Sequence, residues 1–175
     1  MRAGPSVCRW SILTAYISGP EIEAGKFINL MYPHVDAPSE FDYPEDRLLK
    51  LRGILSADFK GDSVRRVIKH GLTTLTTIGN LSGFESHVRR YFGMGVRDSV
   101  EAAIYSDDSD SGPFSRGGDS GSIIVDAPGQ FVALLTSGTG QSDSTDITFG
   151  TPMYWLWDIL KEKFPGADLD FDEKD

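Results

Sequence analysis

The segment Gly-Gly-Asp-Ser-Gly at residues 117–121 contains the residue types that acyl transfer needs. In that chemistry a serine hydroxyl attacks a carbonyl carbon, and the carbonyl oxygen becomes an anion that hydrogen-bond donors must stabilise. Gly118 allows the backbone to turn its N–H group inward, and the N–H group of Ser120 supplies a second donor. Ser120 is therefore the candidate nucleophile, and Gly118 with Ser120 the candidate oxyanion hole. A turn that happens to contain these residue types is the alternative.

The elements expected around this segment are mostly strands. Apolar and β-branched residues lie between glycines at 64–71, 72–83, 101–106, 120–125, 130–138 and 146–152. From Pro152 to Phe164 the apolar residues instead recur at three- and four-residue steps. This spacing predicts a helix, with Thr151 as its N-terminal cap. Prolines throughout residues 33–44 predict an extended or looped segment.

With these motifs in this order, residues 64–164 resemble the second β-barrel of a trypsin-like serine peptidase, which has the chymotrypsin fold. More narrowly, they are similar to uncharacterised fungal trypsin-like proteins without disulfides. The similar segments are Lys-His-Gly-Leu-Thr-Thr-Leu-Thr-Thr-Ile-Gly at 69–79, Gly-Asp-Ser-Gly-Ser at 118–122, Leu-Leu-Thr-Ser-Gly-Thr-Gly at 134–140 and Thr-Phe-Gly-Thr-Pro at 148–152. By resemblance they are an early hairpin, the nucleophile motif, the strand that pairs with substrate and the last strand before the terminal helix.

The resemblance implies a mainly β fold. We expect a single antiparallel six-stranded β-barrel, the C-terminal half of a two-barrel chymotrypsin-like fold, followed by a C-terminal α-helix. Residues 1–63 are expected to be a poorly packed remnant of the inter-barrel region, residues 64–164 to form the barrel and the helix, and residues 165–175 to be an acidic tail.

The resemblance also assigns roles to individual residues. It implies Ser120 as the nucleophile, the N–H groups of Gly118 and Ser120 as the oxyanion hole, and Thr136, Ser137 and Gly138 as substrate-binding residues. Phe114 takes the position of the floor of the primary specificity pocket, where an aromatic ring favours neutral or apolar substrate residues over Lys and Arg. Packing of Phe114 in the core beneath the loop is an equal alternative. Asp119 is not assigned to the catalytic triad and is expected to brace its loop.

The histidine and aspartate of such a triad have no evident counterpart. The three histidines lie in a proline-flanked loop or within the predicted second barrel, at His34, His70 and His87. The aspartates considered before the serine lie in loops, at Asp36, Asp42 and Asp46. We therefore expect a trypsin-like serine endopeptidase homologue that is truncated at its N-terminus and inactive alone. Loss of the first barrel is expected to leave an apolar patch near Ser120.

Two other functions stay open. A non-catalytic module could bind extended peptides by adding them to the strand at 136–138 without cutting them. A split enzyme could obtain its first barrel from another chain. In each case the expected partner is a polypeptide substrate or a peptide ligand.

Composition narrows the remaining partners. The net charge of −9 argues against non-specific binding to nucleic acid and to anionic membranes. The acidic segment 106–112 lacks the terminal glutamate of a calcium loop, so neither a metal nor a cofactor is predicted. Cys8 is the only cysteine, and the chain cannot form an internal disulfide. This cysteine usage favours an intracellular, cytoplasmic location, with secretion as the alternative.

Overall fold

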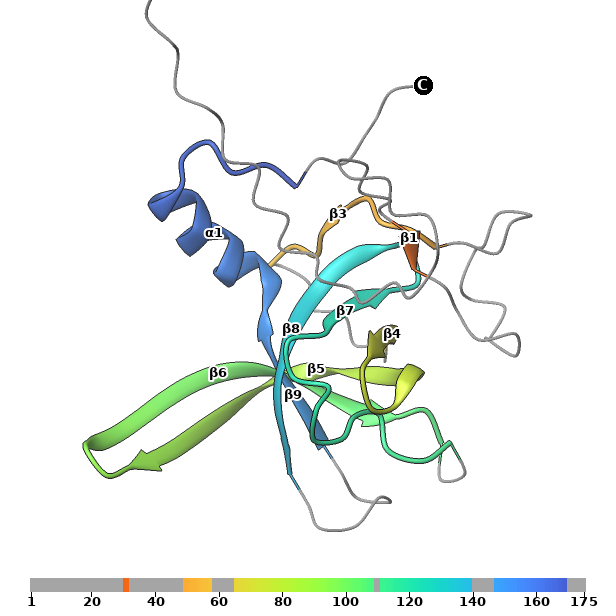
Figure 1. Cartoon of the computed structure of the whole chain (residues 1–175), viewed down its shortest axis with the longest axis horizontal. Coiled ribbons are helices and arrows are strands. Elements are labelled where there is room, and N and C mark those ends of the chain that lie inside the picture. The colour runs from red at the N-terminus through yellow and green to blue at the C-terminus, as the bar shows by residue number, and fades with distance from the viewer. Residues whose placement is uncertain (1–29, 32–48, 58–64, 109–110, 140–146, 170–175) are drawn as a thin grey trace, which may run out of the picture.

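The chain was analysed as a computed structural model, which describes residues 30–31, 49–57, 65–108, 111–139 and 147–169 (Figure 1). Six strands form its main body: β4 (Arg65–Gly71), β5 (Leu75–Phe92), β6 (Gly95–Ser106), β7 (Ile123–Asp126), β8 (Gln130–Thr139) and β9 (Ile147–Pro152). Neighbouring strands pair in the order β8-β7-β4-β5-β6-β9, and β9 pairs back onto β8. All of these pairings are antiparallel, and the pairing of β9 with β8 closes the six strands into a ring. The predicted mainly β fold with a six-stranded antiparallel arrangement is confirmed.

The predicted C-terminal helix is also confirmed. Helix α1 (Met153–Lys163) follows β9 directly, and Lys161 and Lys163 lie in its last turn, where positive charge is favourable. The expected cap was wrong. Pro152 occupies the N-cap position without a side-chain hydrogen bond, and the Thr151 hydroxyl donates instead to Glu101.

The buried apolar side chains form two clusters, because alternate residues of a strand point to opposite faces of the sheet. The first cluster joins five strands of the ring and includes Val67, Leu81, Ile104, Ile124, Val132, Ala133 and Leu135. The second lies on β4, β7 and β8 and includes Ile68, Ile123, Val125 and Phe131. From α1, Met153 and Leu156 pack against this second cluster, so the helix covers part of it.

The described residues of the segment 1–63 include three short strands. Strand β1 (Leu30–Met31) pairs with β2 (Leu49–Lys50), and β3 (Gly53–Ile54) runs parallel to β8. Leu49 and Leu51 are buried in the cluster that contains Ile68 and Phe131. Residues 1–29 and 32–48 lie outside the described residues, as do 170–175 of the expected tail. The three domain boundaries stay predictions.

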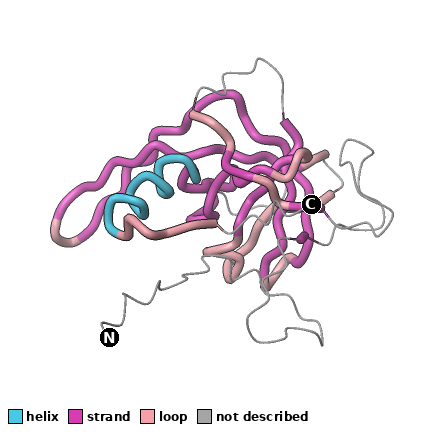
Figure 2. Tube along the Cα trace, turned by 90° about the horizontal axis from the view of Figure 1, so that it is seen from above, coloured by secondary structure: helices cyan, strands magenta, loops and turns pink. Residues whose placement is uncertain are grey.

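Strands β5 and β6 extend beyond the ring as a two-stranded ribbon, which Figures 1 and 2 show projecting from the main body on the same side as α1. The strand register shifts between Leu81 and Glu85, and this irregularity marks where the ribbon leaves the ring. Phe92 and Met94 at the ribbon tip are exposed. Only residues 101–106 of β6 are predicted as a strand from the sequence, so this ribbon is a new feature.

Candidate functional site

The loop between β6 and β7 contains the predicted nucleophile. The N–H group of Asp119 donates to the Arg116 carbonyl (3.1 Å), and the N–H group of Ser122 donates to the Asp119 carbonyl (3.1 Å). Gly118 and Gly121 have φ angles of +105° and +89°, which favour glycine. These two tight turns bury Asp119 and leave Ser120 exposed between them.

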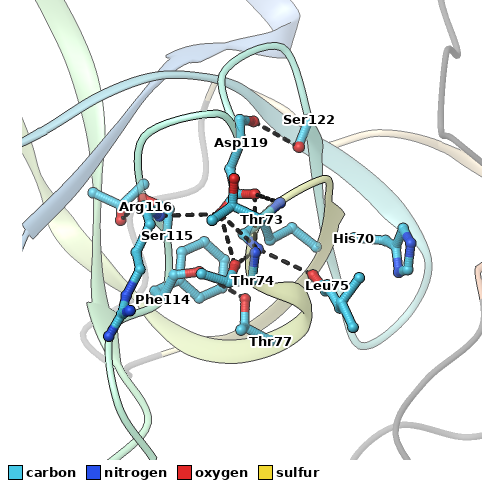
Figure 3. A network of polar contacts seen from close by, with 12 residues as sticks. His70, Thr73, Thr74, Leu75, Thr77, Phe114, Ser115, Arg116, Asp119 and Ser122 are labelled. Atoms are coloured by element: carbon cyan, nitrogen blue, oxygen red, sulfur yellow. Dashed lines mark hydrogen bonds and ion pairs between the residues drawn. The ribbon is translucent and has the colours of Figure 1, made fainter. Parts of the chain in front are cut away.

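The carboxylate of Asp119 anchors the loop to the turn between β4 and β5 (Figure 3). Its Oδ1 atom accepts hydrogen bonds from the backbone N–H groups of Thr73 (2.7 Å) and Thr74 (3.2 Å). Its Oδ2 atom accepts from the Thr74 hydroxyl (2.6 Å) and the Arg116 N–H group (3.0 Å). The Thr73 hydroxyl donates to the Gly117 carbonyl (2.9 Å), so the turn also holds the backbone next to Gly118.

A buried lysine completes this network. Lys69 Nζ lies 3.5 Å from Asp119 Oδ2, and both side chains are 0% exposed. The same ammonium group donates to the Thr74 hydroxyl and to the Leu75 carbonyl (3.1 Å). It also lies 5.6 Å from the centre of the Phe114 ring. The positive charge thus sits directly beneath the loop that carries Ser120.

The network favours the charged form of Asp119. Burial opposes ionisation, but hydrogen bonds from Thr74, Arg116 and Thr73, together with the charge of Lys69, outweigh it and lower the pKa of Asp119 to about 2. For Lys69, loss of hydration lowers the pKa, and the attraction of Asp119 offsets part of that effect. Asp119 is therefore a stable anion that fixes the loop from within.

The backbone of the loop leaves two donors available. Within the described residues, neither Gly118 nor Ser120 donates its N–H group to a backbone carbonyl. At Gly118 a Cβ atom would lie 2.4 Å from the Thr73 hydroxyl, so a larger residue would displace the loop. The oxyanion-hole role of Gly118 and Ser120 stays a prediction.

The loop is joined directly to β8, the predicted substrate-binding strand. The Gly121 N–H group donates to the Leu135 carbonyl (2.8 Å), and the Leu135 N–H group donates to the Ser122 carbonyl (2.9 Å). Beyond Leu135 the strand pairs only with β9 among the described residues. Residues 136–138 therefore present one unpaired backbone edge beside the loop that carries Ser120, within the described part of the chain.

Side chains of the predicted substrate-binding residues have partners outside the loop. The Ser137 hydroxyl accepts a hydrogen bond from Arg90 (2.6 Å), and the Thr136 hydroxyl donates to the Phe149 carbonyl (3.2 Å). Phe114 is 1% exposed and packs in the barrel core with Leu55, Val67, Leu81 and Ile104. This burial favours the core-packing interpretation of Phe114, and its role as a pocket floor stays a prediction.

The two described histidines, His70 and His87, contact residues outside the loop that carries Ser120. His70 Nδ1 lies 2.8 Å from the Thr76 hydroxyl oxygen, and Figure 3 shows its ring directed away from Asp119. Burial, followed by the charge of Lys69, lowers the pKa of His70. His87 lies on the β5–β6 ribbon opposite Val100. His34 and the three N-terminal aspartates considered above lie outside the described residues.

Lys69 is the residue of this network that sequence reasoning missed. The motif Lys-His-Gly was recognised as part of a hairpin, but no role was given to the lysine. One signal was available, since Lys69 directly follows the apolar pair Val67 and Ile68 in a strand. If the strand is part of a closed ring and the charged side chain points into it, that side chain requires a buried partner.

Neither a metal site nor a membrane span is found among the described residues. No group of three or more His, Cys, Asp and Glu side chains there is arranged to hold a metal ion. The same part of the chain contains no helix with the length and apolar character that crossing a membrane requires.

Comparison with known proteins finds similarity at the level of structure. No family model and no curated protein matches the chain. Protease A of Thermobifida fusca superposes with a TM-score of 0.50 at 20% identity, over 75% of this chain and 57% of that protein. A chymotrypsin of Cellulomonas bogoriensis has a TM-score of 0.49 at 18% identity, over 80% of this chain and 62% of that one. A Nocardiopsis protease has a TM-score of 0.49 at 15% identity, with 78% and 58% covered.

The chain thus spans about three fifths of the length of these proteases, which are 57% to 62% covered. At 20% identity the likeness to the Thermobifida protease establishes the fold and not the activity. Together with the closed six-stranded ring and its terminal helix, it shows that this chain has the fold of the chymotrypsin-like serine proteases.

Proposed function

We propose that the chain is a trypsin-like serine endopeptidase homologue that carries the nucleophile half of the active site. The observation that carries this proposal is the direct connection between the Ser120 loop and β8 through Leu135. In support of the proposal, Ser120 is exposed on this loop, and residues 136–138 of β8 have one backbone edge unpaired among the described residues. A polypeptide that added to residues 136–138 would run past Ser120 in extended form.

The proposed chemistry follows from this arrangement. Ser120 Oγ attacks the carbonyl carbon of the bound peptide, a C–O bond forms, and the carbonyl oxygen takes the electron pair of the C=O π bond. The N–H groups of Gly118 and Ser120 stabilise that oxyanion. The proton of Ser120 passes to a base, which returns it to the leaving amine as the peptide C–N bond breaks.

We infer that this base comes from outside the described residues. His70 is engaged with Thr76, and His87 lies on the ribbon. A histidine and an orienting aspartate on a first barrel, either in the same polypeptide or in another one, would complete the site. A serine that lacks its base reacts several orders of magnitude more slowly. The 175-residue chain by itself is therefore proposed to be inactive, and to act in polypeptide binding at most.

A fluorophosphonate probe, which labels activated serines, tests the catalytic proposal. We expect no labelling of the chain alone above that of Ser120→Ala. We expect labelling of Ser120 once the chain is fused to, or mixed with, a first barrel that supplies histidine and aspartate. In that completed protein, His70→Ala and His87→Ala should label like the parent. Strong labelling of the isolated chain that disappears on mutating His34, His70 or His87 would contradict the proposal.

Binding without cleavage is the second candidate function, and the open edge of β8 supports it independently of any base. Fluorescence anisotropy with labelled extended peptides tests it on Ser120→Ala, which removes the nucleophile but leaves the strand edge. Peptides with N-methylated backbones should bind at least tenfold more weakly, because they cannot donate to β8. Equal binding of both peptide types would exclude strand addition.

A further inference from the structure

A cavity of about 580 Å³ lies away from the Ser120 loop, between the base of the β5–β6 ribbon and the start of α1. The ribbon and α1 extend to the same side of the ring in Figures 1 and 2. The walls of the cavity include Glu85, His87, Asp98 and Glu101 from the ribbon strands and Tyr154 and Trp155 from α1. No residue of the 113–122 loop or of the β8 edge lines it. Its volume is within the range of sites for small ligands.

Glu101 is the unusual group in this cavity. Its residue is only 4% exposed, and its Oε2 atom accepts one hydrogen bond, from the Thr151 hydroxyl (3.2 Å). Within the described residues, Glu101 forms no ion pair, and its Oε1 atom has no donor. Buried carboxylates are normally paired with a cation or hydrogen-bonded at both oxygens, because an uncompensated buried charge costs several kcal/mol.

The two other carboxylates of the cavity, Asp98 and Glu85, differ in whether a cation of the protein neutralises their charge. Asp98 forms a two-point contact with Arg89, with N–O distances of 2.7 and 2.9 Å, so it adds little net charge. Glu85 has no such cation among the described residues and accepts a hydrogen bond from the Tyr154 hydroxyl (3.4 Å). Burial, followed by the charge of Glu85, raises the pKa of Tyr154 and keeps its phenol neutral. Glu85 and Glu101 thus make the cavity negative.

The aromatic wall adds a second requirement for the ligand. Tyr154 and Trp155 provide ring surfaces, and Trp155 remains 53% exposed. Aromatic faces attract organic cations and cover their aliphatic stems. A smaller adjoining hollow of about 80 Å³ shares Glu85, Pro152 and Tyr154 and is bordered by Leu81 and Phe84. It extends the apolar surface on which such a stem can lie.

We propose that this cavity binds an organic cation, an ammonium or guanidinium group on a short aliphatic stem. Carboxylates at Glu85 and Glu101 neutralise its charge, and Tyr154 and Trp155 cover its stem. An anion is disfavoured by both carboxylates. A bare metal ion is disfavoured because the described acidic side chains do not converge on one point. The cation can be a free amine or a Lys or Arg side chain of a polypeptide. This site does not depend on the proposed function.

Isothermal titration calorimetry of the full chain tests the site with three probes. Cadaverine represents a free amine, acetyl-Gly-Lys-Gly-amide represents a peptide side chain, and 1-pentanol is the uncharged control. We expect saturable binding of a cationic probe with a Kd of about 1 mM or tighter, and none of pentanol. Binding of cadaverine alone identifies a free amine as the ligand, and comparable binding of the peptide identifies a side chain.

Charge-neutral variants locate the binding. Glu85→Gln and Glu101→Gln should each weaken cation binding about tenfold. Glu162→Gln should not, although it removes the same negative charge at an exposed position on α1. If Glu101→Gln fails to fold, Glu85→Gln still decides the matter. The proposal is overturned if neither cationic probe binds the parent chain, if pentanol binds as tightly, or if the Glu85 and Glu162 variants bind alike.

Discussion

Lys69 and Asp119 depend on each other, because the fold removes both side chains from water next to Ser120. Replacing Lys69 by Met should leave the Asp119 carboxylate buried without its cation. Losing one partner of a buried ion pair costs about 3–5 kcal/mol of unfolding free energy. The double variant Lys69→Met with Asp119→Asn should recover much of this loss. Urea unfolding of the parent and the variants measures both effects, and a single-variant loss below about 1 kcal/mol would contradict the expected dependence.

The lowered pKa of Asp119 predicts a specific acid sensitivity. An unfolded aspartate has the higher pKa of 3.8, so the unfolded chain binds this proton more readily than the folded one. The stability from Asp119 is therefore fully present above pH 3.8 and is lost as the pH falls through about 2. From pH 5 to 2, the stability difference between the parent and Asp119→Asn should shrink by about 1–2 kcal/mol. A constant difference over this range would show that Asp119 is not the responsible group.

At the scale of the elements, Gly79 allows β5 to pass close to its neighbours. A Cβ atom there would lie 2.5 Å from the Tyr105 carbonyl oxygen and 2.6 Å from the Phe114 ring. Gly79→Ala should therefore destabilise the ring by about 1–3 kcal/mol, since the backbone of β6 must shift. Gly93→Ala is the matched control, because nothing lies within 4 Å of its Cβ position. Equal unfolding midpoints in urea would contradict this account.

The elements that sequence reasoning predicted are those with buried apolar residues. Around the ring, apolar residues and bounding glycines identified the positions of β4, β7, β8 and β9, and three- and four-residue spacing identified α1. The ribbon was missed because it has no buried face. At its tip Tyr91, Phe92 and Met94 are all exposed, so buried and exposed residues do not alternate there.

The candidate site was predictable only in part, for a related reason. The Gly-Asp-Ser-Gly segment marks its own loop, and Leu-Leu-Thr-Ser-Gly marks the strand beside it. The pairing of Lys69 with Asp119 joins residues far apart in sequence, and ring closure alone makes it visible. A lysine in an isolated strand would face solvent. The same limitation hid the Glu101 cavity, whose walls come from a ribbon, a strand end and a helix.

At the scale of the whole molecule, two exposed leucines lie in the turn that contacts the Ser120 loop. Leu72 is 70% exposed and Leu75 is 57% exposed, and Thr73 between them bonds to Gly117. The expected apolar patch near Ser120 stays a prediction, and these two side chains are the candidates for it. Leu75 also has a φ of +57°, which asparagine tolerates better. We expect Leu72→Ser with Leu75→Asn to reduce self-association and the binding of a hydrophobic dye.

Sedimentation velocity and dye fluorescence measure this change. Met94→Ser is the control, because it removes an apolar side chain at the ribbon tip that is more exposed than either leucine. If the leucine variants and the Met94 variant lower association equally, no particular surface is responsible. If the parent chain is strictly monomeric and binds no dye, the turn does not act as an apolar contact face.

Closure of the ring by β9 has a consequence for the order of events during protein synthesis. Strand β9 (Ile147–Pro152) is the neighbour of both β6 and β8, yet it is the last of the six ring strands to leave the ribosome. Until it has been made, the nascent chain carries two bare strand edges that can pair with other chains. Because the pairing of β6 with β9 joins residues far apart in sequence, such as Ala102 and Gly150, folding will also be slow relative to that of helical domains. A nascent chain halted before residue 147 should therefore require chaperone protection, which release of β9 would make unnecessary.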